Sequence, residues 1–137
     1  MKVLVDTTIW SQAFRRRTIA PTTEVHELKR LILDFQATLI GPIRQELLSG
    51  IAEPAQYRFL SDLMVPFANE AVIDSDYELA AEFFNKCRNK GLQGSNTDFL
   101  ICAVAARKSM PIFTADNDFL FFAKCLPIAL HKVVIRR

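Results

Sequence analysis

The stretch MKVLVDTTIW, residues 1–10, decides the fold class of this chain. Residues 2–5 form a short run, rich in valine and leucine and without alternation, which is typical of a strand buried on both faces. The run ends at Asp6, and the two threonines that follow can begin a helix with Asp6 or a threonine at its N-cap. A buried strand that passes directly into a helix is the opening unit of an α/β fold. By itself, Asp6 is more readily explained as a helix cap than as a functional residue.

The same alternation of short apolar runs and helical patterns continues along the chain. Apolar residues at helical spacing predict helices over residues 22–35, 42–50, 54–64, 75–91, 95–110 and 117–125. Short apolar runs predict further strands over residues 37–41, 111–115 and 130–135. Two of the helices carry a capping-box pattern at their start, Ser75 with Glu78 and Ser95 with Asp98.

Strands separated by helices throughout the chain predict a parallel sheet with helices on both faces. The chain has 137 residues, half of them hydrophobic, which is enough for one domain with a substantial core and too few for two comfortable ones. We therefore expect one α/β/α sandwich with a mostly parallel central sheet over residues 1–137.

Composition and charge argue against several function classes. The net charge of +2, from 17 basic and 15 acidic residues, gives no overall electrostatic reason to expect nucleic-acid binding. RNA binding would therefore rest on a local cluster such as Arg15, Arg16 and Arg17. The three cysteines form no CxxC pair and the two histidines lack metal-ligand spacing, which argues against a zinc site. No signal peptide is visible, and no apolar stretch reaches the roughly twenty residues of a membrane span. We expect a cytoplasmic protein without a membrane partner.

Acidic residues stand where an open α/β sheet binds its ligands, in the crevice beyond the carboxyl ends of the strands. Asp6 ends the first predicted strand. Asp116 and Asp118 follow directly on the strand over residues 111–115. Asp98 stands in the first turn of a predicted helix.

Glu46 needs a separate explanation. It lies three residues after Ile43 and about 60° around the helix from it, so it borders the apolar face of the helix over residues 42–50. A carboxylate at that edge requires a partner, such as an arginine, a bound cation or a backbone donor. Pairing at the surface with Arg44 or Lys29 is the simplest alternative.

Each of the other acids also has a purely structural explanation. Asp6 can cap a helix, Asp98 can be half of a capping box, and Asp116 can accept backbone hydrogen bonds in a turn. Their convergence is harder to explain, because two ionised carboxylates about 4 Å apart repel by roughly 4 kcal/mol at an effective dielectric constant of about 20. Such a group predicts raised pKa values or a bound divalent cation. Oxygen ligands without histidine or cysteine favour Mg²⁺ or Mn²⁺, which suits phosphodiester cleavage.

Four segments together resemble a known family. VLVDTTIW, PIRQELLSG, NTDFLICAVA and IFTADNDF are similar to the four acidic motifs of PIN-domain ribonucleases, in particular the VapC-type toxins of toxin–antitoxin pairs. Each motif is weakly specific, but the four occur in order and cover essentially the whole chain. The resemblance implies one or two Mg²⁺ or Mn²⁺ ions held by Asp6, Glu46, Asp98 and Asp116.

The resemblance also implies supporting roles for neighbouring residues. Thr114 is similar to the strand-end hydroxyl that holds the family's site in place, and Asp118 stands where an accessory metal ligand can lie. Thr7 and Asn96 are candidate hydrogen-bond donors around the metal ligands.

The reaction that the resemblance implies is hydrolysis of RNA by metal-activated water, without a covalent intermediate. Members of this family form homodimers, and a cognate antitoxin neutralises them by covering the groove. Phe14, Phe59 and Phe67 are candidates for such a covered surface, and equally for ordinary core.

Other functions fit the residues less well. A haloacid-dehalogenase-type phosphatase needs a second aspartate two residues after the first, where this chain has Thr8. A response-regulator receiver needs an acidic pair near the first strand and a lysine at the end of the last. Two alternatives stay open within a PIN-like fold: an RNA-processing nuclease without a toxin role, and a non-catalytic binding module.

Overall fold

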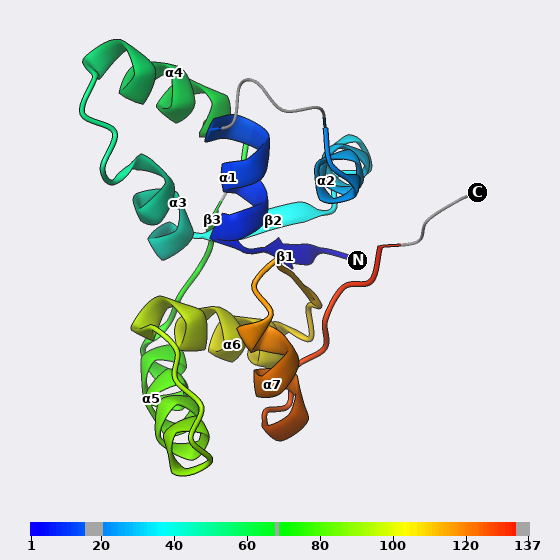
Figure 1. The fold of residues 1–137 in the computed structure, drawn as a ribbon, viewed down its shortest axis with the longest axis vertical. Coiled ribbons are helices and arrows are strands. Elements are labelled where there is room, and N and C mark those ends of the chain that lie inside the picture. The colour runs from blue at the N-terminus through cyan, green and yellow to red at the C-terminus, as the bar shows by residue number, and fades with distance from the viewer. Residues whose placement is uncertain (16–20, 68, 134–137) are drawn as a thin grey trace.

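The structure is a computed structural model that describes residues 1–15, 21–67 and 69–133 (Figure 1). In chain order its elements are β1 (Val3–Val5), α1 (Thr7–Arg15), α2 (Thr23–Leu33), β2 (Ala37–Ile40), α3 (Gly41–Leu48), α4 (Pro54–Met64), β3 (Asn69–Glu70), α5 (Asp74–Asn89), α6 (Asn96–Lys108), β4 (Ile112–Phe113) and α7 (Asp118–Cys125). Within the described ranges, no helix is both long enough and apolar enough to cross a membrane.

Strand β1 lies inside the sheet, whose strand order over the described residues is β3-β2-β1-β4. Leu4 pairs with Thr38 of β2 on one side and with Ile112 of β4 on the other, and both pairings are parallel. Ile40 pairs with Glu70 of β3, again in parallel. Because all four strands point the same way, the segments that follow β1, β2 and β4 emerge at one edge of the sheet.

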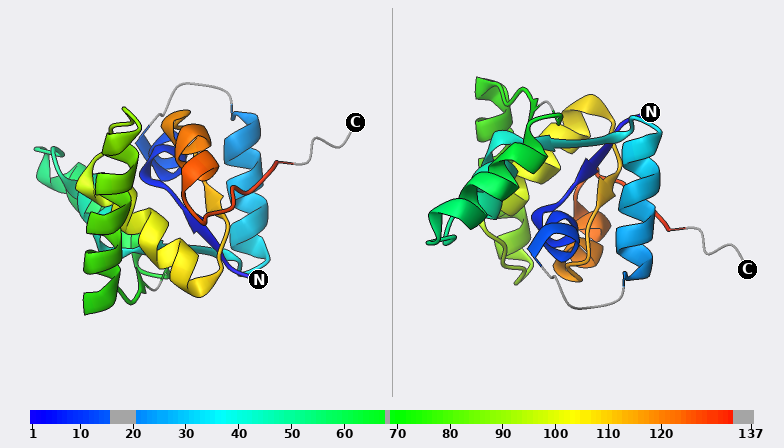
Figure 2. Two further views of the ribbon diagram at one scale, coloured as in Figure 1. Left: turned by 90° about the horizontal axis from the view of Figure 1, so that it is seen from below. Right: turned by 90° about the horizontal axis from the view of Figure 1, so that it is seen from above.

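Helices cover both faces of this sheet. In Figure 1, α1 and α2 lie above the sheet and α6 and α7 lie below it, with α5 packed against α6. The helices α3 and α4 extend beside α1, and the views in Figure 2 show the same arrangement. The predicted α/β fold, with a parallel sheet between helical layers, is confirmed.

Large aromatic side chains fill the core. Trp10 is fully buried, and its Nε1 donates a hydrogen bond of 3.0 Å to the carbonyl oxygen of Val5, which ties α1 to β1. Helix α6 is buried at every position from Phe99 to Ala105, because it packs between the sheet and α5. The ring centroids of Phe99 and Phe122 are 5.0 Å apart, so α6 and α7 share one aromatic cluster. Each large apolar side chain buried in this way contributes roughly 1.5–3 kcal/mol.

Helix α2 ends at Leu33, earlier than its apolar spacing predicted. Phe35 adopts a left-handed conformation with φ of 58° and is 91% exposed. The chain reverses at this point because Gln36 leads directly into β2, and the Gln36 N–H donates a hydrogen bond of 2.8 Å to the carbonyl oxygen of Leu31. Phe35 is therefore a surface residue, although the pattern placed it on the buried face.

The predicted capping box of Ser75 and Glu78 is wrong. Helix α5 already begins at Asp74, and Oδ2 of Asp76 accepts a hydrogen bond of 2.9 Å from the N–H of Ile73. Asp76 is 1% exposed and pairs with Nε of Arg107 at 2.7 Å. The helix therefore starts two residues before the predicted N3 position of Glu78 would require, with Asp76 both capping α5 and pairing with α6.

Two strand assignments differ from the sequence pattern. Strand β3 was not predicted, since a strand of two residues is too short to show a period. The predicted strand over residues 130–135 is reduced, among the described residues, to one parallel bridge between Leu130 and Ile112. Residues 134 and 135 lie outside the described part of the chain.

Candidate active site

Strand β1 delivers Asp6 to the carboxyl edge of the sheet. The N–H of Asp6 donates a hydrogen bond of 2.8 Å to the carbonyl oxygen of Phe113, which anchors it against the end of β4. Its side chain is 4% exposed. Oδ2 accepts hydrogen bonds from the hydroxyls of Thr8 at 2.9 Å and Thr114 at 2.8 Å. These two donors fix the orientation of the carboxylate.

The second oxygen of Asp6 has no such partner. Among the described residues no hydrogen bond reaches Oδ1, which leaves that oxygen available to a ligand. The expected side-chain cap of α1 is not formed, because the N–H groups of Ile9 and Trp10 donate to the backbone carbonyl of Asp6, at 3.1 and 3.4 Å. The buried carboxylate therefore has no role in capping this helix.

Asp98 approaches the same edge from the first turn of α6. The predicted capping box is confirmed: the N–H of Asp98 donates to Oγ of Ser95, and Oδ2 of Asp98 accepts from the N–H of Ser95, both at 3.0 Å. Burial raises the pKa of Asp98, and the negative charges of Asp6 and Asp116 raise it further. Asp6 and Asp116 thus both lie close enough to Asp98 to repel its charge.

Asp116 is placed by the turn that follows β4. Its N–H donates a hydrogen bond of 3.0 Å to Oγ1 of Thr114, and its Oδ1 accepts one of 2.9 Å from the N–H of Asp118. Asp116 therefore makes the turn contacts that a structural role requires and also contributes charge to the site. The side chain of Asp118 is exposed at the start of α7, and no described contact ties it to the other acids.

Glu46 is linked to the site by a hydrogen bond from Thr7. It is exposed on α3, and its Oε1 accepts a hydrogen bond of 2.7 Å from Oγ1 of Thr7. Pairing with Arg44 is excluded, because the Arg44 guanidinium donates to Oδ1 of Asn69 and to two backbone carbonyls near the end of α4. No ion pair within the described ranges involves Glu46, so its charge adds to the acidic edge of the sheet.

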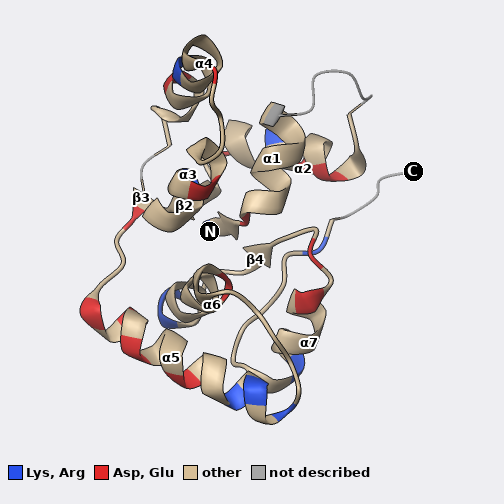
Figure 3. Ribbon diagram, turned by 60° about the vertical axis from the view of Figure 1, so that its left-hand side comes forward, with Lys and Arg blue, Asp and Glu red and all other residues tan. Residues whose placement is uncertain are grey.

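The remaining predicted residues fall outside this cluster. Asn96 makes no hydrogen bond to any of the acids among the described residues and lines a neighbouring cavity instead. Arg16 and Arg17 lie outside the described part of the chain, and only the backbone of Arg15 is described, at the end of α1. In Figure 3, acidic positions on α3 and α6 lie toward the middle of the molecule, whereas basic positions gather at the far end of α5.

Sequence reasoning missed Thr8. Besides contacting Asp6, its Oγ1 accepts a hydrogen bond of 3.0 Å from the N–H of Ala115. Thr8 therefore bridges the segments that follow β1 and β4. A threonine two residues after a strand-end aspartate is the only local signal, and its meaning depends on the pairing of β1 with β4.

The donor chemistry fits a hard divalent cation, although the side chains are not yet gathered around one point. Within the described ranges, no three side chains of His, Cys, Asp or Glu are already close enough to hold a metal ion. The carboxylates are nevertheless near enough for Asp6 and Asp116 to raise the pKa of Asp98. A cation would relieve this repulsion, and Asp6, Asp98 and Asp116, with Glu46 beside them, are the residues that would hold it.

A parallel sheet with carboxylates gathered beyond the ends of β1 and β4 defines an α/β domain with an acidic site at its carboxyl edge. The chain matches the PIN domain family over residues 3–124, and it belongs to that family.

Several solved structures share this fold at low sequence identity. The FitAcB structure from Neisseria gonorrhoeae is 20% identical, with a TM-score of 0.74 over 95% of this chain and 96% of that chain. VapBC2 from Rickettsia felis, bound to a promoter DNA fragment, is 19% identical, with a TM-score of 0.73 over 96% and 98%. VapBC-5 from Mycobacterium tuberculosis, a member of the VapBC family of toxin–antitoxin systems, is 21% identical, with a TM-score of 0.70 over 96% and 98%. Comparison with the curated proteins gave no match.

Proposed function

We propose that this chain is an endoribonuclease that depends on Mg²⁺ or Mn²⁺ and is the toxin of a toxin–antitoxin pair. The observation that carries the proposal is that Asp6 and Asp116 lie near enough to Asp98, at the carboxyl edge of the sheet of a PIN domain, to raise its pKa. A surplus of negative charge at a partly buried site costs stability, so a site built in this way favours a bound cation.

Some residues of this site would bind the cation, and others orient the residues that bind it. Asp6 would be one of the ligands of the ion, and Thr8 and Thr114 orient its carboxylate through their hydrogen bonds to Oδ2. Asp98 contributes from α6 and Asp116 from the end of β4. When bound, Mg²⁺ or Mn²⁺ supplies activation of the attacking water and stabilisation of the charge that develops on the phosphate. The acids act as ligands and form no bond to the substrate.

Fold neighbours support the toxin role. VapBC-5 is a member of the VapBC family of toxin–antitoxin systems, and VapBC2 carries the same family name. As the family resemblance implies, we further propose that the chain forms a homodimer in the cytoplasm and that a cognate antitoxin covers its acidic site. Experiments must distinguish this toxin role from two alternatives, an RNA-processing nuclease and a non-catalytic binding module.

Cleavage of RNA by the purified protein tests the enzymatic part. We expect cleavage of structured RNA with Mg²⁺ or Mn²⁺ and none in EDTA. Asp6→Asn and Asp98→Asn should each abolish cleavage and leave the fold intact, whereas Asp62→Asn on the exposed side of α4 is the matched control and should cleave normally. Cleavage that persists in EDTA would refute the metal mechanism. Absence of cleavage under all of these conditions would favour the binding module.

Growth on expression tests the toxin part. We expect expression of the chain to arrest growth, expression of Asp6→Asn to be harmless, and a small protein encoded in the adjacent reading frame to restore growth. Harmless expression of an active enzyme, with no such neighbour, would leave an RNA-processing nuclease as the function.

A further inference from the structure

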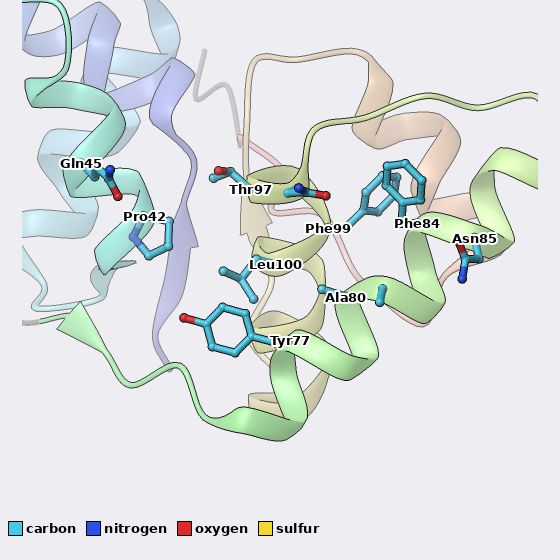
Figure 4. Close-up of a pocket in the computed structure, with 11 residues that line it drawn as sticks. Pro42, Gln45, Tyr77, Ala80, Phe84, Asn85, Thr97, Phe99 and Leu100 are labelled. Atoms are coloured by element: carbon cyan, nitrogen blue, oxygen red, sulfur yellow. The ribbon is translucent and has the colours of Figure 1, made fainter.

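A cavity of about 510 Å³ lies between α3, α5 and α6, next to the acidic site. Gln45 and Thr97 line it, and each directly precedes one of the acids, Glu46 and Asp98. In Figure 4, Gln45 and Thr97 face each other from opposite sides of the gap between α3 and α6, and Leu100 lies deeper between them and Tyr77. The same turns of α3 and α6 therefore carry both an acid and a residue that lines this cavity.

The lining of the cavity is uncharged. It combines amide side chains, chiefly Gln45 and Asn96, with the aromatic rings of Tyr77, Phe84 and Phe99. A phosphate group would find no cation there, whereas a planar uncharged ring would find aromatic faces and hydrogen-bonding edges. Volumes of roughly 300–1,000 Å³ with few polar groups are typical of small-molecule sites.

The polar groups of this lining are available to a ligand. In the part of the chain that the structure describes, the side chains of Gln45, Asn96 and Thr97 and the hydroxyl of Tyr77 make no hydrogen bond. Each amide presents both donors and an acceptor. Tyr77 is 56% exposed, and in Figure 4 its ring extends from α5 toward Pro42 across the mouth of the cavity. An aromatic ring in this position is open to stacking.

Charge changes along the path that leads away from the acids. A second hollow of about 280 Å³ shares Phe84 and Phe99 with the cavity and adds Arg88 of α5. Arg88 is exposed and has no ion-pair partner among the described residues. The acidic site is thus followed in space by a neutral cavity and then by the basic end of a helix. This order matches an RNA strand, which offers a reacting phosphate, a base and a further phosphate.

We propose that the cavity between α3, α5 and α6 binds one unstacked nucleobase of single-stranded or loop RNA, stacked on Tyr77 and read at its edge by Gln45 and Asn96. This inference rests on the proposed ribonuclease function and names the feature of RNA that it selects. Proteins recognise unpaired RNA in this way, by stacking bases on aromatic side chains and bonding their exposed edges. Arg88 then contacts the backbone phosphate of a neighbouring nucleotide.

Binding measured without catalysis tests the proposal. Fluorescent single-stranded RNA decamers of adenosine, uridine or cytidine are titrated with the protein in EDTA, next to decamers that carry abasic sites. Loss of one stacked base corresponds to roughly 5- to 150-fold in affinity. We expect Tyr77→Ala to weaken binding within this range, and the abasic decamers to bind wild type about as weakly. Tyr57→Ala, on α4 and also partly exposed, is the matched control and should bind within twofold of wild type.

Three further variants separate base recognition from phosphate contact. Gln45→Ala and Asn96→Ala should change the order of preference among the three decamers. Arg88→Gln should weaken all three equally and reduce the slope of log affinity against log salt concentration by about 0.7. Thermal unfolding and the sedimentation coefficient of each variant are recorded in parallel, so that loss of folding or of a subunit contact is detected.

Several results would overturn the inference. One is equal binding by Tyr77→Ala and Tyr57→Ala, and another is equal affinity for intact and abasic decamers. A third is a loss of binding by Tyr77→Ala that follows a change in oligomeric state, which would make the cavity a contact between copies. A protein that binds the decamers base-dependently but cleaves no RNA would refute the proposed function and leave this inference standing. A protein that cleaves RNA without base-dependent binding would refute this inference and leave the proposed function standing.

Discussion

The hydroxyl of Thr114 donates a hydrogen bond of 2.8 Å to Oδ2 of Asp6, across 108 residues of chain. Thr8 donates to the same oxygen at 2.9 Å. One carboxylate oxygen is thus saturated by two hydroxyl donors, and Oδ1 is left for a ligand. Groups that orient a metal ligand in this way fix the geometry of a site before the ion arrives. The pairing of β1 with β4 therefore brings together Asp6 and the threonine that orients its carboxylate.

Thr114→Val should weaken Mn²⁺ binding and RNA cleavage by about 10- to 100-fold, because removal of an orienting partner of a metal ligand has this order of effect. Thr114→Ser keeps the hydroxyl and should stay within a few-fold of wild type. Mn²⁺ titration by calorimetry and initial cleavage rates as a function of Mn²⁺ measure the two effects. Equal affinities for Val and Ser variants would show that the hydroxyl does not orient Asp6.

Asp98→Asn should abolish cleavage and stabilise the metal-free protein. The pKa of Asp98 is raised in the folded state, mainly by burial and then by Asp6 and Asp116. The folded protein therefore binds the proton more tightly than the unfolded chain, and wild type loses stability as the pH rises through the interval above the ordinary pKa of 3.8. Asparagine does not ionise, and it keeps an oxygen to accept from the N–H of Ser95.

Denaturant unfolding of wild type and Asp98→Asn in EDTA, at low and at neutral pH, measures this difference. We expect the variant to be more stable by about 0.5–1.5 kcal/mol at neutral pH, and the gap to narrow toward acid pH. Added Mg²⁺ should stabilise wild type more than the variant, because binding to the folded state alone raises stability. A variant that is less stable than wild type at neutral pH would refute the repulsion.

Local patterns in the sequence suffice for the elements that local chemistry determines. The buried run before Asp6 predicts β1, and the pair Ser95 and Asp98 predicts the start of α6, because strand burial and helix capping leave signals within a few residues. The parallel order of the sheet follows from the alternation of strands and helices. The roles of the four acids as metal ligands stay predictions, carried by the resemblance and by their positions.

Contacts between distant segments were not predictable in the same way. Thr8 acquires its role only when β4 lies beside β1, and Asp76 pairs with Arg107, which lies 31 residues away on α6. Strand β3 has two residues, and one of them, Glu70, is buried and pairs with Lys2 and Lys108, which are far apart in the sequence. A sequence pattern with a period of two or 3.6 residues contains no information about such partners.

The ion pairs of the buried Glu70 should make the stability of the fold sensitive to acid. It is 8% exposed, its carboxylate lies 2.7 Å from Nζ of Lys108 and 3.0 Å from Nζ of Lys2, and Oγ1 of Thr38 donates to it at 3.2 Å. The hydrogen bond from Lys108, assisted by Lys2 and opposed by burial, lowers the pKa of Glu70 to about 2. A lowered pKa contributes stability that is full above the ordinary value of 4.5 and is lost as the pH falls through about 2.

Glu70→Gln should therefore reduce the free energy of unfolding by about 1–2 kcal/mol at neutral pH, less than the full pKa shift implies because Lys2 is largely exposed. The difference from wild type should shrink between about pH 4.5 and pH 2. Urea unfolding across this range measures it, and Glu82→Gln on the exposed side of α5 is the control. A difference that is the same at all pH values would show that packing, rather than charge, accounts for the effect of Glu70→Gln.

Gly94 tests how tightly the start of α6 is packed. A Cβ atom built on Gly94 would lie 2.8 Å from Cζ of Phe122, closer than real Cβ contacts, and 3.0 Å from Cε2 of Phe99, which is tighter than most of them. Both rings belong to the buried aromatic cluster and have little room to move, so Gly94→Ala should cost about 1–3 kcal/mol and lower Tm by several degrees. Gly41→Ala is the control, because its nearest neighbour, Nδ2 of Asn69, would be 3.9 Å away. Since Asp98 follows four residues after Gly94, displacement of this segment should also slow cleavage. Equal Tm values for the two alanine variants would show that the aromatic rings move aside without loss of stability.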